Sequence, residues 1–456
     1  MEYKLRNNAN HGAWCSLLLP CCLFPFMIKF GSGIYILLFN ICLCTLLVPT
    51  VQESKSNNRS WLEENGYIVM LSLPPSLFIW HFFSYNLLLT YALCLFGILY
   101  YSHLIKNLLV KCPGSFTYGE AQVISQGVML FTLYSIVTLL SKVVESHNFS
   151  VIEAVPQSVI CLQILLLGCI LLVHTLCLIP SSRQGIHFVF CCILFSGLMM
   201  SAWHVTLKKN IFIWMWLYCL HDKKRVFLIL FWLLSTFSSV TFVVWINWKP
   251  NYKASTLVRK YFHGIICIVY IPGIFYDLDL LRLASGIALT AFIVLEMFRI
   301  LNVPIIGSAI QSAFEVFLDE KDSGILILTN IYLLIGCSSP IWLTGYISGT
   351  KGYHICLLSG IISVGLGDAA ASVGGTLLGK HRWAGSNKTF EGSICAIVTQ
   401  VVASFYFLSL GHELSLYNIT IIIAAVLFTS LLEAKTTQVD NLVLPLFMFT
   451  FLCWIH

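Results

Sequence analysis

Repeated apolar runs, each long enough to cross a lipid bilayer, constrain this chain more than any other feature. A helix needs roughly 20 mostly apolar residues to span the hydrocarbon core. Runs of this kind recur at Ile34–Val51, Ser158–Leu178, Phe188–Thr206, Val226–Asn247 and Ile325–Ile347. Only 10% of the 456 residues are charged, against roughly 25% in soluble domains. The chain is therefore predicted to be an all-α, polytopic integral membrane bundle of about 13–15 transmembrane helices, and not a barrel, which would show short alternating segments.

Charge and motif content divide the chain into two regions. Residues 1–247 form an N-terminal transmembrane region to which we assign no function, whereas residues 248–456 hold most of the charged motifs and form the expected catalytic region. Lys4 and Arg6 precede the first apolar stretch without a small-residue cleavage site, so we expect an uncleaved first segment. The 18 cysteines lie mostly inside apolar runs and are interpreted as packing residues.

Basic residues cluster at four places between residues 208 and 382, which contributes to a net charge of +6: Lys208–Lys209, Lys223–Arg225, Arg259–Lys260 and Lys380–Arg382. In a membrane protein such clusters are typical of cytoplasmic loops. The short aromatic stretch Asn210–His221 lies between the first two clusters. Its length leaves two possibilities open, a crossing or a position at the membrane interface.

The spacing of the apolar stretches predicts which charged segments meet. Four stretches separate the basic loop 248–264 from residues 367–393, and two more separate those residues from residues 431–446. An even number of crossings returns the chain to the same side of the membrane. We therefore expect these three segments to lie on one face and to build a single site.

Residues 367–393, GDAAASVGGTLLGKHRWAGSNKTFEGS, combine five charged side chains with glycines. Gly374–His381 almost spells a Walker A loop, but a histidine stands where Ser or Thr should hold magnesium, and no βαβ unit surrounds it. We therefore reject a P-loop. Glycines still allow backbone N–H groups to approach phosphate oxygens, and the start of the next helix is itself an anion site.

Positive charge in this segment predicts a nucleotide-phosphate site. We expect Lys388 and Arg382, together with backbone amides near Gly375 and Gly379, to bind the triphosphate group of the nucleotide.

Acidic residues in the charged segments predict metal binding and catalysis. Asp368 follows an apolar run, where an ionisable group is usually functional, although a helix-end residue reaching for water is the alternative. Asp368 and Asp440 are expected to hold Mg²⁺ against phosphate oxygens. If the site transfers a phosphoryl group, Arg259 and Lys260 would stabilise the charge of that group, although loop charge alone would also explain them. His263 is the better general base because a histidine titrates near pH 6.5, with Asp368 as the competing candidate.

One further charged pair lies inside an apolar stretch. Glu296 and Arg299 are three residues apart, so they are expected to form an ion pair within a helix, with a position in the site as the alternative.

Several segments resemble the dolichol kinase family, part of a superfamily of CTP-dependent lipid kinases. They are STLVRKYFHG, the segment 367–393, LLEAKTTQVDNLVLPL, residues 322–343 and GSFTYGEA at 114–121. The resemblance covers residues 250–456 well and the N-terminal half in patches. It implies transfer of the γ-phosphate of CTP to dolichol, giving dolichyl phosphate for protein glycosylation. It also implies an endoplasmic reticulum membrane protein whose nucleotide site faces the cytosol.

The resemblance also implies roles for particular residues. Asp368 and Gly375 match positions that the superfamily uses for activity, Arg259, Lys260 and His263 match its Arg-Lys-x-x-His element, and the CTP motif spans residues 367–392. The nucleotide-binding residues assigned on this basis are Gly367, Gly374, Gly375, Gly379, Arg382, Lys388, Thr389, Glu391 and Gly392. The expected partners are CTP, dolichol and membrane lipid, with no nucleic acid.

Two rival functions remain open at the level of sequence. Another lipid kinase or cytidylyltransferase of the superfamily would act on diacylglycerol, phytol or phosphatidate. A transporter could also carry charges within the membrane, but it would more often show repeated halves with interrupted helices, and we find no such repeat.

Overall fold

The computed structural model describes residues 4–7, 9–30, 33–48, 61–83, 86–144, 155–183, 185–248, 255–303, 306–318, 321–344, 354–411 and 413–455. These residues are helical almost throughout, and their one β feature is an isolated bridge between Arg382 and Thr389. The prediction of an all-α membrane protein is confirmed. Part of the basic loop 248–264, residues 249–254, lies outside the described residues.

The chain forms two compact units. Unit 1 comprises Met1–Glu153 with two short later segments, Ser323–Ile325 and Thr437–Val439, and unit 2 comprises the remainder. The boundary after residue 153 does not coincide with the predicted division after residue 247. Helices between residues 157 and 247 pack with helices of the C-terminal region, as α7 does against α13 and α10 against α12.

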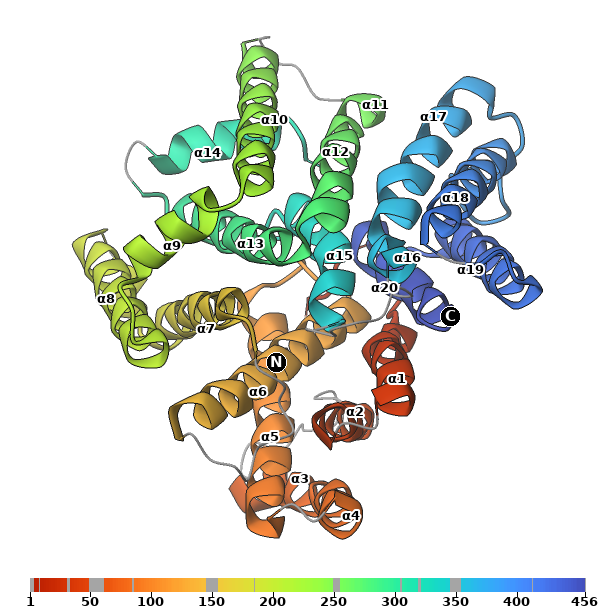
Figure 1. The fold of residues 1–456 in the computed structure, drawn as a ribbon. Helices are drawn as coiled ribbons and strands as arrows, with labels where there is room; N and C mark the ends of the chain where they lie inside the picture. The colour runs from red at the N-terminus through yellow and green to blue at the C-terminus, as the bar shows by residue number, and fades with distance from the viewer. Residues whose placement is uncertain are drawn as a thin grey trace. The chain divides into compact units, whose positions relative to one another are not determined.

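Unit 1 contains the helices coloured red to orange in Figure 1. They are η1 (Ala13–Leu17), α1 (Leu18–Phe30), α2 (Gly33–Leu46), α3 (Trp61–Leu71), α4 (Leu73–Phe83), α5 (Leu87–Lys111) and α6 (Tyr118–Val144). Gly97 explains the close packing of α5, because a Cβ there would lie 2.9 Å from Leu133 and 3.1 Å from Ile41. The Asn86 side chain caps α5 by accepting from the Leu89 N–H.

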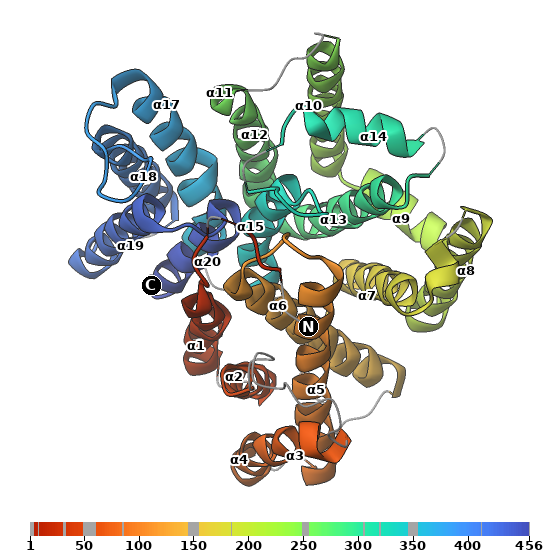
Figure 2. The same cartoon turned by 180° about the vertical axis from the view of Figure 1, so that it is seen from behind.

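Unit 2 contains the remaining helices, coloured yellow to blue in Figure 1. They are α7 (Gln157–Leu178), η4 (Pro180–Arg183), α8 (Gly185–Leu207), α9 (Ile211–Leu220), α10 (Lys223–Asn247), α11 (Thr256–Arg259), α12 (Tyr261–Tyr276), α13 (Leu278–Ile300), α14 (Ile306–Glu315), α15 (Thr329–Leu343), α16 (His354–Leu357), the π-helix η6 (Ile361–Asp368), α17 (Ala369–Leu378), α18 (Phe390–Gly411), α19 (Leu416–Lys435) and α20 (Asp440–Leu452). Helices α17, α18 and α19 lie side by side in Figures 1 and 2.

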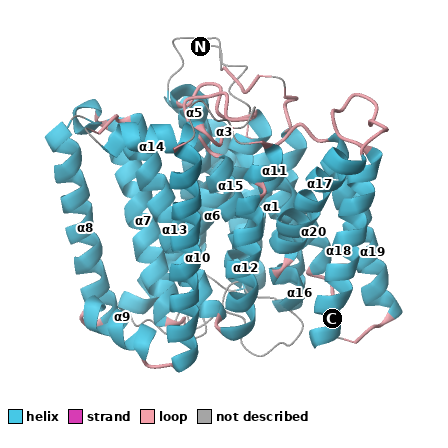
Figure 3. Cartoon of the chain, turned by 90° about the horizontal axis from the view of Figure 1, so that it is seen from above, coloured by secondary structure: helices cyan, strands magenta, loops and turns pink. Residues whose placement is uncertain are grey.

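Fewer helices are long enough to cross a membrane than the apolar runs of the sequence predict. Nine helices of the described residues are long and apolar enough to cross a membrane, against the expected 13–15, and six further apolar helices have only 10–17 residues. One of these is α9, whose length decides whether the stretch Asn210–His221 crosses the membrane. Its ten residues extend about 15 Å, half the thickness of the hydrocarbon core, so α9 does not cross. It lies at one end of the unit 2 helices (Figure 3).

The three charged segments meet as predicted, because Lys260 contacts Asp368 and Lys388 contacts Asp440. Helices α12, α13 and α15, followed by the α16–η6–α17 run, separate Arg259 from the α17–α18 loop. Figure 3 shows that loop and α11 at the end of unit 2 opposite α9. Helix α10 begins at Lys223 beside α9 and ends at Asn247. The Lys223–Arg225 and Arg259–Lys260 clusters thus lie at opposite ends of α10, so the two clusters cannot both mark loops on the same side of the membrane.

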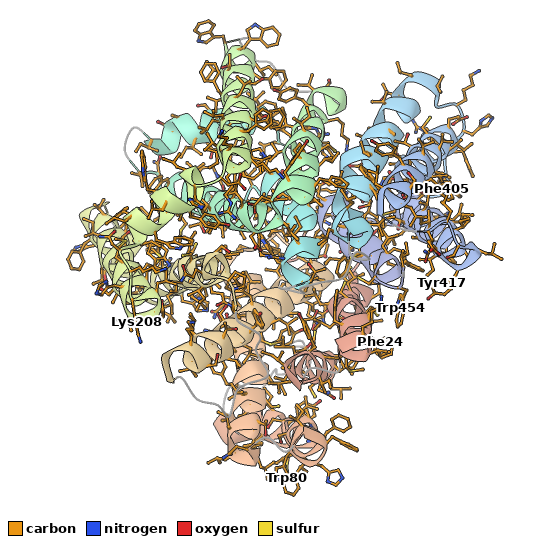
Figure 4. All side chains as sticks on the ribbon, in the orientation of Figure 1. Phe24, Trp80, Lys208, Phe405, Tyr417 and Trp454 are labelled. Carbon is orange, nitrogen blue, oxygen red and sulfur yellow. The ribbon has the colours of Figure 1, made fainter. Side chains whose placement is uncertain are left out.

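Large apolar side chains cover the outside of each unit (Figure 4). Trp80 of unit 1 is 48% exposed and Tyr417 of unit 2 is 50% exposed. Such side chains suit a lipid environment, where apolar exposure carries no penalty.

Candidate active site

Asp368 is a buried acid in the middle of a continuous helical run. It ends the π-helix η6 and leads directly into α17, which continues for ten residues, or about 15 Å. Only 6% of Asp368 is exposed. The alternative of a helix-end residue reaching for water is therefore wrong. π-helical turns are frequent at functional sites.

The first two turns of α12 supply the partners of this carboxylate. Lys260 Nζ lies 2.5 Å from Asp368 Oδ2, and His263 Nε2 lies 3.2 Å from the same oxygen. The two helices approach closely because Gly365 has no side chain, and a Cβ there would lie 2.4 Å from Cys267 Sγ. His263 is 6% exposed, and neither of its ring nitrogens has a partner in hydrogen-bond geometry among the described residues, although Nε2 lies close to Asp368. It therefore offers a buried acceptor beside Asp368.

A second group of charges centres on Lys388, just before α18. Its Nζ donates to the Glu433 carbonyl at 2.6 Å and to Asp440 Oδ2 at 3.2 Å, and lies 3.6 Å from Glu433 Oε1. Lys321 Nζ contacts the same Asp440 oxygen at 3.0 Å. Two of the three segments predicted to share one face thus meet through Lys388, Glu433 and Asp440, and Lys321 joins them from a segment for which no prediction was made.

The carboxylates around Lys388 determine its charge. Burial disfavours the ammonium form, but Asp440, Glu433 and Asp368 outweigh burial and raise the pKa of Lys388 well above its ordinary value. Lys388 is consequently a permanent cation at physiological pH and not a proton acceptor.

Two of the expected nucleotide-binding residues instead hold the loop between α17 and α18. Glu391 accepts from the His381 backbone N–H, and its Oε1 lies 2.7 Å from His381 Nδ1. Thr389 Oγ1 accepts from the Gly392 N–H and so caps α18. Trp383 stacks on Phe390 with ring centroids 3.9 Å apart. The loop is therefore an ordered hairpin beside the site.

The glycines of the motif let helices approach one another. A Cβ at Gly367 would lie 2.2 Å from Gln400, one at Gly374 would lie 2.4 Å from Cys395, and one at Gly392 would lie 2.7 Å from the Ala371 carbonyl. Gly375 lies inside α17, and the Gly379 N–H donates to the Gly375 carbonyl. The expectation of free backbone amides at Gly375 and Gly379 is therefore not met, because the helix uses them.

The remaining basic candidates lie at the edge of the site. The Arg382 side chain is exposed, and Arg259, the last residue of α11, is half-buried.

Sequence reasoning missed two residues of the site. Glu433, 4% exposed, is an acid within an apolar span, and that signal was available. Lys321 carried no signal, because it lies in a short charged stretch that resembles an ordinary polar loop.

The donor set permits a divalent cation with few protein ligands. No group of three or more His, Cys, Asp or Glu side chains in the described ranges is arranged to hold a metal ion. However, Asp440 Oδ1 and Glu433 Oε2 are both buried and lack a hydrogen-bond partner among the described residues. Mg²⁺ is commonly held by one or two carboxylates with substrate phosphates, so these oxygens fit it better than Asp368 Oδ2, which contacts Lys260.

The Glu296–Arg299 pair has the structural role expected of it. Arg299 Nη2 contacts Glu296 Oε1 at 2.7 Å, and the same oxygen accepts from the Ile327 N–H. The pair fixes the chain entering α15.

The helices are of membrane-spanning type, and they bury ammonium groups paired with carboxylates. This combination defines a class of membrane-embedded proteins that handle a charged substrate at the membrane surface. Comparison with known proteins narrows this class. A family model described as dolichol kinase matches residues 87–398. The chain is 33% identical over 374 residues to a dolichol kinase of Bos taurus, a match covering 77% of this chain and 68% of the relative. It therefore belongs to the dolichol kinase family.

More distant relatives agree. A dolichol kinase of Arabidopsis thaliana is 27% identical over 383 residues, covering 77% of this chain and 66% of the relative. A dolichol kinase of Saccharomyces cerevisiae is 32% identical over 193 residues, covering 42% of this chain and 35% of the relative. No solved structure matches the chain.

Proposed function

We propose that this chain is a dolichol kinase that transfers the γ-phosphate of CTP to the terminal hydroxyl of dolichol, producing dolichyl phosphate and CDP. Family membership supports the reaction class. The observation that carries the site assignment is the convergence of Lys260 and His263 on Asp368, beside Lys388 and Asp440.

His263 is the general base of this proposal. Asp368 faces Nε2, which favours a proton on that nitrogen and leaves the buried Nδ1 as the acceptor. Nδ1 takes the proton of the dolichol hydroxyl as the oxygen attacks the γ-phosphorus and the bond to the β-phosphate oxygen breaks. Asp368 orients the imidazole and stabilises the imidazolium that forms, as a carboxylate does in other acid–histidine pairs.

Lysine side chains provide the electrostatic stabilisation in this proposal. Phosphoryl transfer depends mainly on positioning and on neutralising the charge of the transferring group. Lys260 and Lys388 supply fixed positive charge, with Arg259 and Arg382 at the edge of the site to hold the triphosphate. The loop glycines and the Thr389 cap keep α17 and α18 close enough for this arrangement.

Asp440 and Glu433 would hold Mg²⁺, with Asp368 close by. The ion would neutralise charge on the phosphate oxygens. Lys388 contacts both carboxylates, so its ammonium lies where it would also face the phosphates of a nucleotide whose Mg²⁺ they hold.

A transfer assay tests the reaction. Purified protein in lipid vesicles is given CTP or ATP labelled at the γ-phosphate, with dolichol, phytol or diacylglycerol as acceptor. Labelled dolichyl phosphate formed from CTP is expected. Transfer to diacylglycerol or phytol in preference to dolichol would overturn the acceptor assignment, a CDP-lipid product would overturn the kinase assignment, and preference for ATP would overturn the donor.

We also propose that the chain resides in the endoplasmic reticulum membrane with the α17–α18 loop in the cytosol. The loop offers a direct test because Asn387 is exposed and begins an Asn-Lys-Thr glycosylation sequence. A cytosolic loop leaves Asn387 without a glycan, so Asn387→Gln should not alter electrophoretic mobility. A glycan at Asn387 would place the loop in the lumen and contradict the proposed orientation.

A further inference from the structure

The motif GSFTYGEA, residues 114–121, has no role in the site described above, yet it binds a segment that adjoins the site. Unit 1 includes Thr437–Val439, which directly precede Asp440 in the chain. Unit 1 also includes Ser323–Ile325, which directly follow Lys321 and Asp322. Lys321 and Asp440 contact each other. Each member of this pair is therefore within two residues of a segment that unit 1 holds.

Glu120, at the start of α6, is the centre of the contacts with residues 437–439. Its Oε1 accepts from the Val439 N–H at 2.8 Å and from Arg6 Nη2 at 2.7 Å. Arg6 Nη2 also donates to the Thr437 carbonyl at 3.0 Å. Glu120 is 0% exposed and Arg6 4%. A buried ion pair that also binds the backbone on both sides of Gln438 leaves that backbone little freedom.

The side chain of Gln438 is held as well. Its Oε1 accepts from Thr117 Oγ1, and its Nε2 donates to Asn10 Oδ1 at 2.8 Å. Gly12 adopts a φ of 63°, and a Cβ there would lie 2.4 Å from the Gln438 side chain. Only glycine takes this conformation in this space without strain.

The second segment is held by close backbone packing. A Cβ at Gly324 would lie 2.4 Å from the Ser115 backbone nitrogen, and Ser323 Oγ donates to the Gly114 carbonyl at 3.5 Å. Residues 114–120 thus hold the chain after Lys321 and also the chain before Asp440.

We propose that Glu120, together with Arg6, is a positioning residue for Asp440. By fixing the Val439 N–H it restrains the backbone that directly precedes Asp440, the residue at which α20 begins. The N-terminal region therefore acts on the site through the covalent chain. This inference rests on the proposed function, because it assumes that Asp440 serves nucleotide binding.

The test is a double-mutant cycle between Glu120 and Asp440. Glu120→Gln removes the charge that pairs with Arg6. Because Asp440 would then be misplaced, kcat/KM for CTP should fall by about 10- to 100-fold. The KM for dolichol should not change. In the Asp440→Asn background the same change should cost less than about 2-fold, because residues that act through each other are not additive. Costs that simply multiply would overturn the inference.

A matched control separates positioning from stability. Gln126 lies on the same helix, is 0% exposed, and donates to the Ser16 carbonyl and to Thr45 Oγ1 within unit 1. Gln126→Leu should lower the thermal midpoint comparably to Glu120→Gln, leave KM for CTP unchanged, and combine additively with Asp440→Asn. If Gln126→Leu raised KM for CTP as Glu120→Gln does, the effect would be general destabilisation and the positioning role would be lost.

Two further measurements keep the result interpretable. If Glu120→Gln does not fold, Gln438→Ala takes its place in the cycle, since Gln438 belongs to the same held segment. Hydrogen exchange at the Val439 amide should be slow in the unmodified chain and faster in Glu120→Gln, whether or not the protein transfers phosphate. Absence of transfer to dolichol would therefore overturn the proposed function alone, and equal exchange at Val439 would overturn the positioning role alone.

Discussion

Lys260 Nζ and Asp368 Oδ2 lie 2.5 Å apart although 108 positions separate the two residues in the chain. One side chain comes from the start of α12 and the other from the end of the π-helix η6. Taking both charges out of water is costly, and leaving one unpaired is costlier. Because burying this pair is costly, we expect that Asp368 has a function.

Asp368→Asn is expected to abolish measurable transfer to dolichol, a loss of at least about 10³-fold. The amide cannot compensate Lys260 or orient the His263 imidazole. The measurement is kcat with purified, folded protein. Asp279→Asn is the control, because Asp279 pairs with Arg282 at 2.7 Å at the far end of α13; its activity should stay within a few-fold. Comparable losses in both variants would argue against a special role for Asp368.

Lys388→Met is expected to lower kcat/KM for CTP by about 10²- to 10³-fold, since it removes a charge aimed at phosphate. The pKa of Lys388 is raised well above its ordinary value by Asp440 and Glu433 despite burial. The residue is therefore protonated at every pH below about 10, near its unfolded pKa. The ratio of unmodified to variant kcat/KM should stay constant from about pH 6 to about pH 9.

The stability of the two proteins should diverge only in strong alkali. A lysine whose folded pKa lies above its unfolded value contributes stability that is complete below the unfolded pKa and is lost as pH rises through the folded one. The part of the stability difference between the unmodified chain and Lys388→Met that comes from Lys388 itself should thus be flat to about pH 10 and shrink above it. A difference that changed near neutral pH would show that another group titrates.

Glu433→Gln tests the assignment that sequence reasoning missed. The change removes one of the two buried carboxylates that face Lys388, so divalent-cation binding should weaken by at least about 10-fold. Mn²⁺ binding followed by electron paramagnetic resonance in the presence of CTP measures this without turnover. Glu413→Gln, on the loop before α19, is the control. Unchanged Mn²⁺ affinity in Glu433→Gln would leave Asp440 and Asp368 as the ligands.

Gly367→Ala should cost activity through packing. A Cβ at this position would lie 2.2 Å from Gln400 Nε2, so η6 must shift and move the adjacent Asp368. We expect about a 10- to 100-fold loss of kcat. Gln400→Ala in the same chain should restore most of it by removing the obstructing atoms. At Gly197 a Cβ would meet no atom within 4 Å, so Gly197→Ala should be silent. Failure of the double variant to recover would contradict the packing explanation.

Much of this architecture could be predicted from sequence because it depends on local composition. Apolar runs of bilayer length specify helices whatever surrounds them, and counting crossings placed Arg259, Asp368 and Asp440 at one end. The basic clusters did not indicate their own side, because the short helix α9 and the span α10 place Lys223–Arg225 at the end opposite Arg259–Lys260.

The sequence by itself determined the class of fold and the face on which the charged segments gather. It also identified Asp368, Lys388 and Asp440 as functional candidates, because charged residues in a membrane protein usually have a function. Only the tertiary structure decided their partners. Whether Lys260 or Arg259 meets Asp368, and whether Glu433 joins the group, depends on how helices rotate about their axes and how closely glycines such as Gly365 and Gly367 let them approach. Those contacts join residues dozens to hundreds of positions apart, as Glu120 and Val439 show, and no local pattern encodes them.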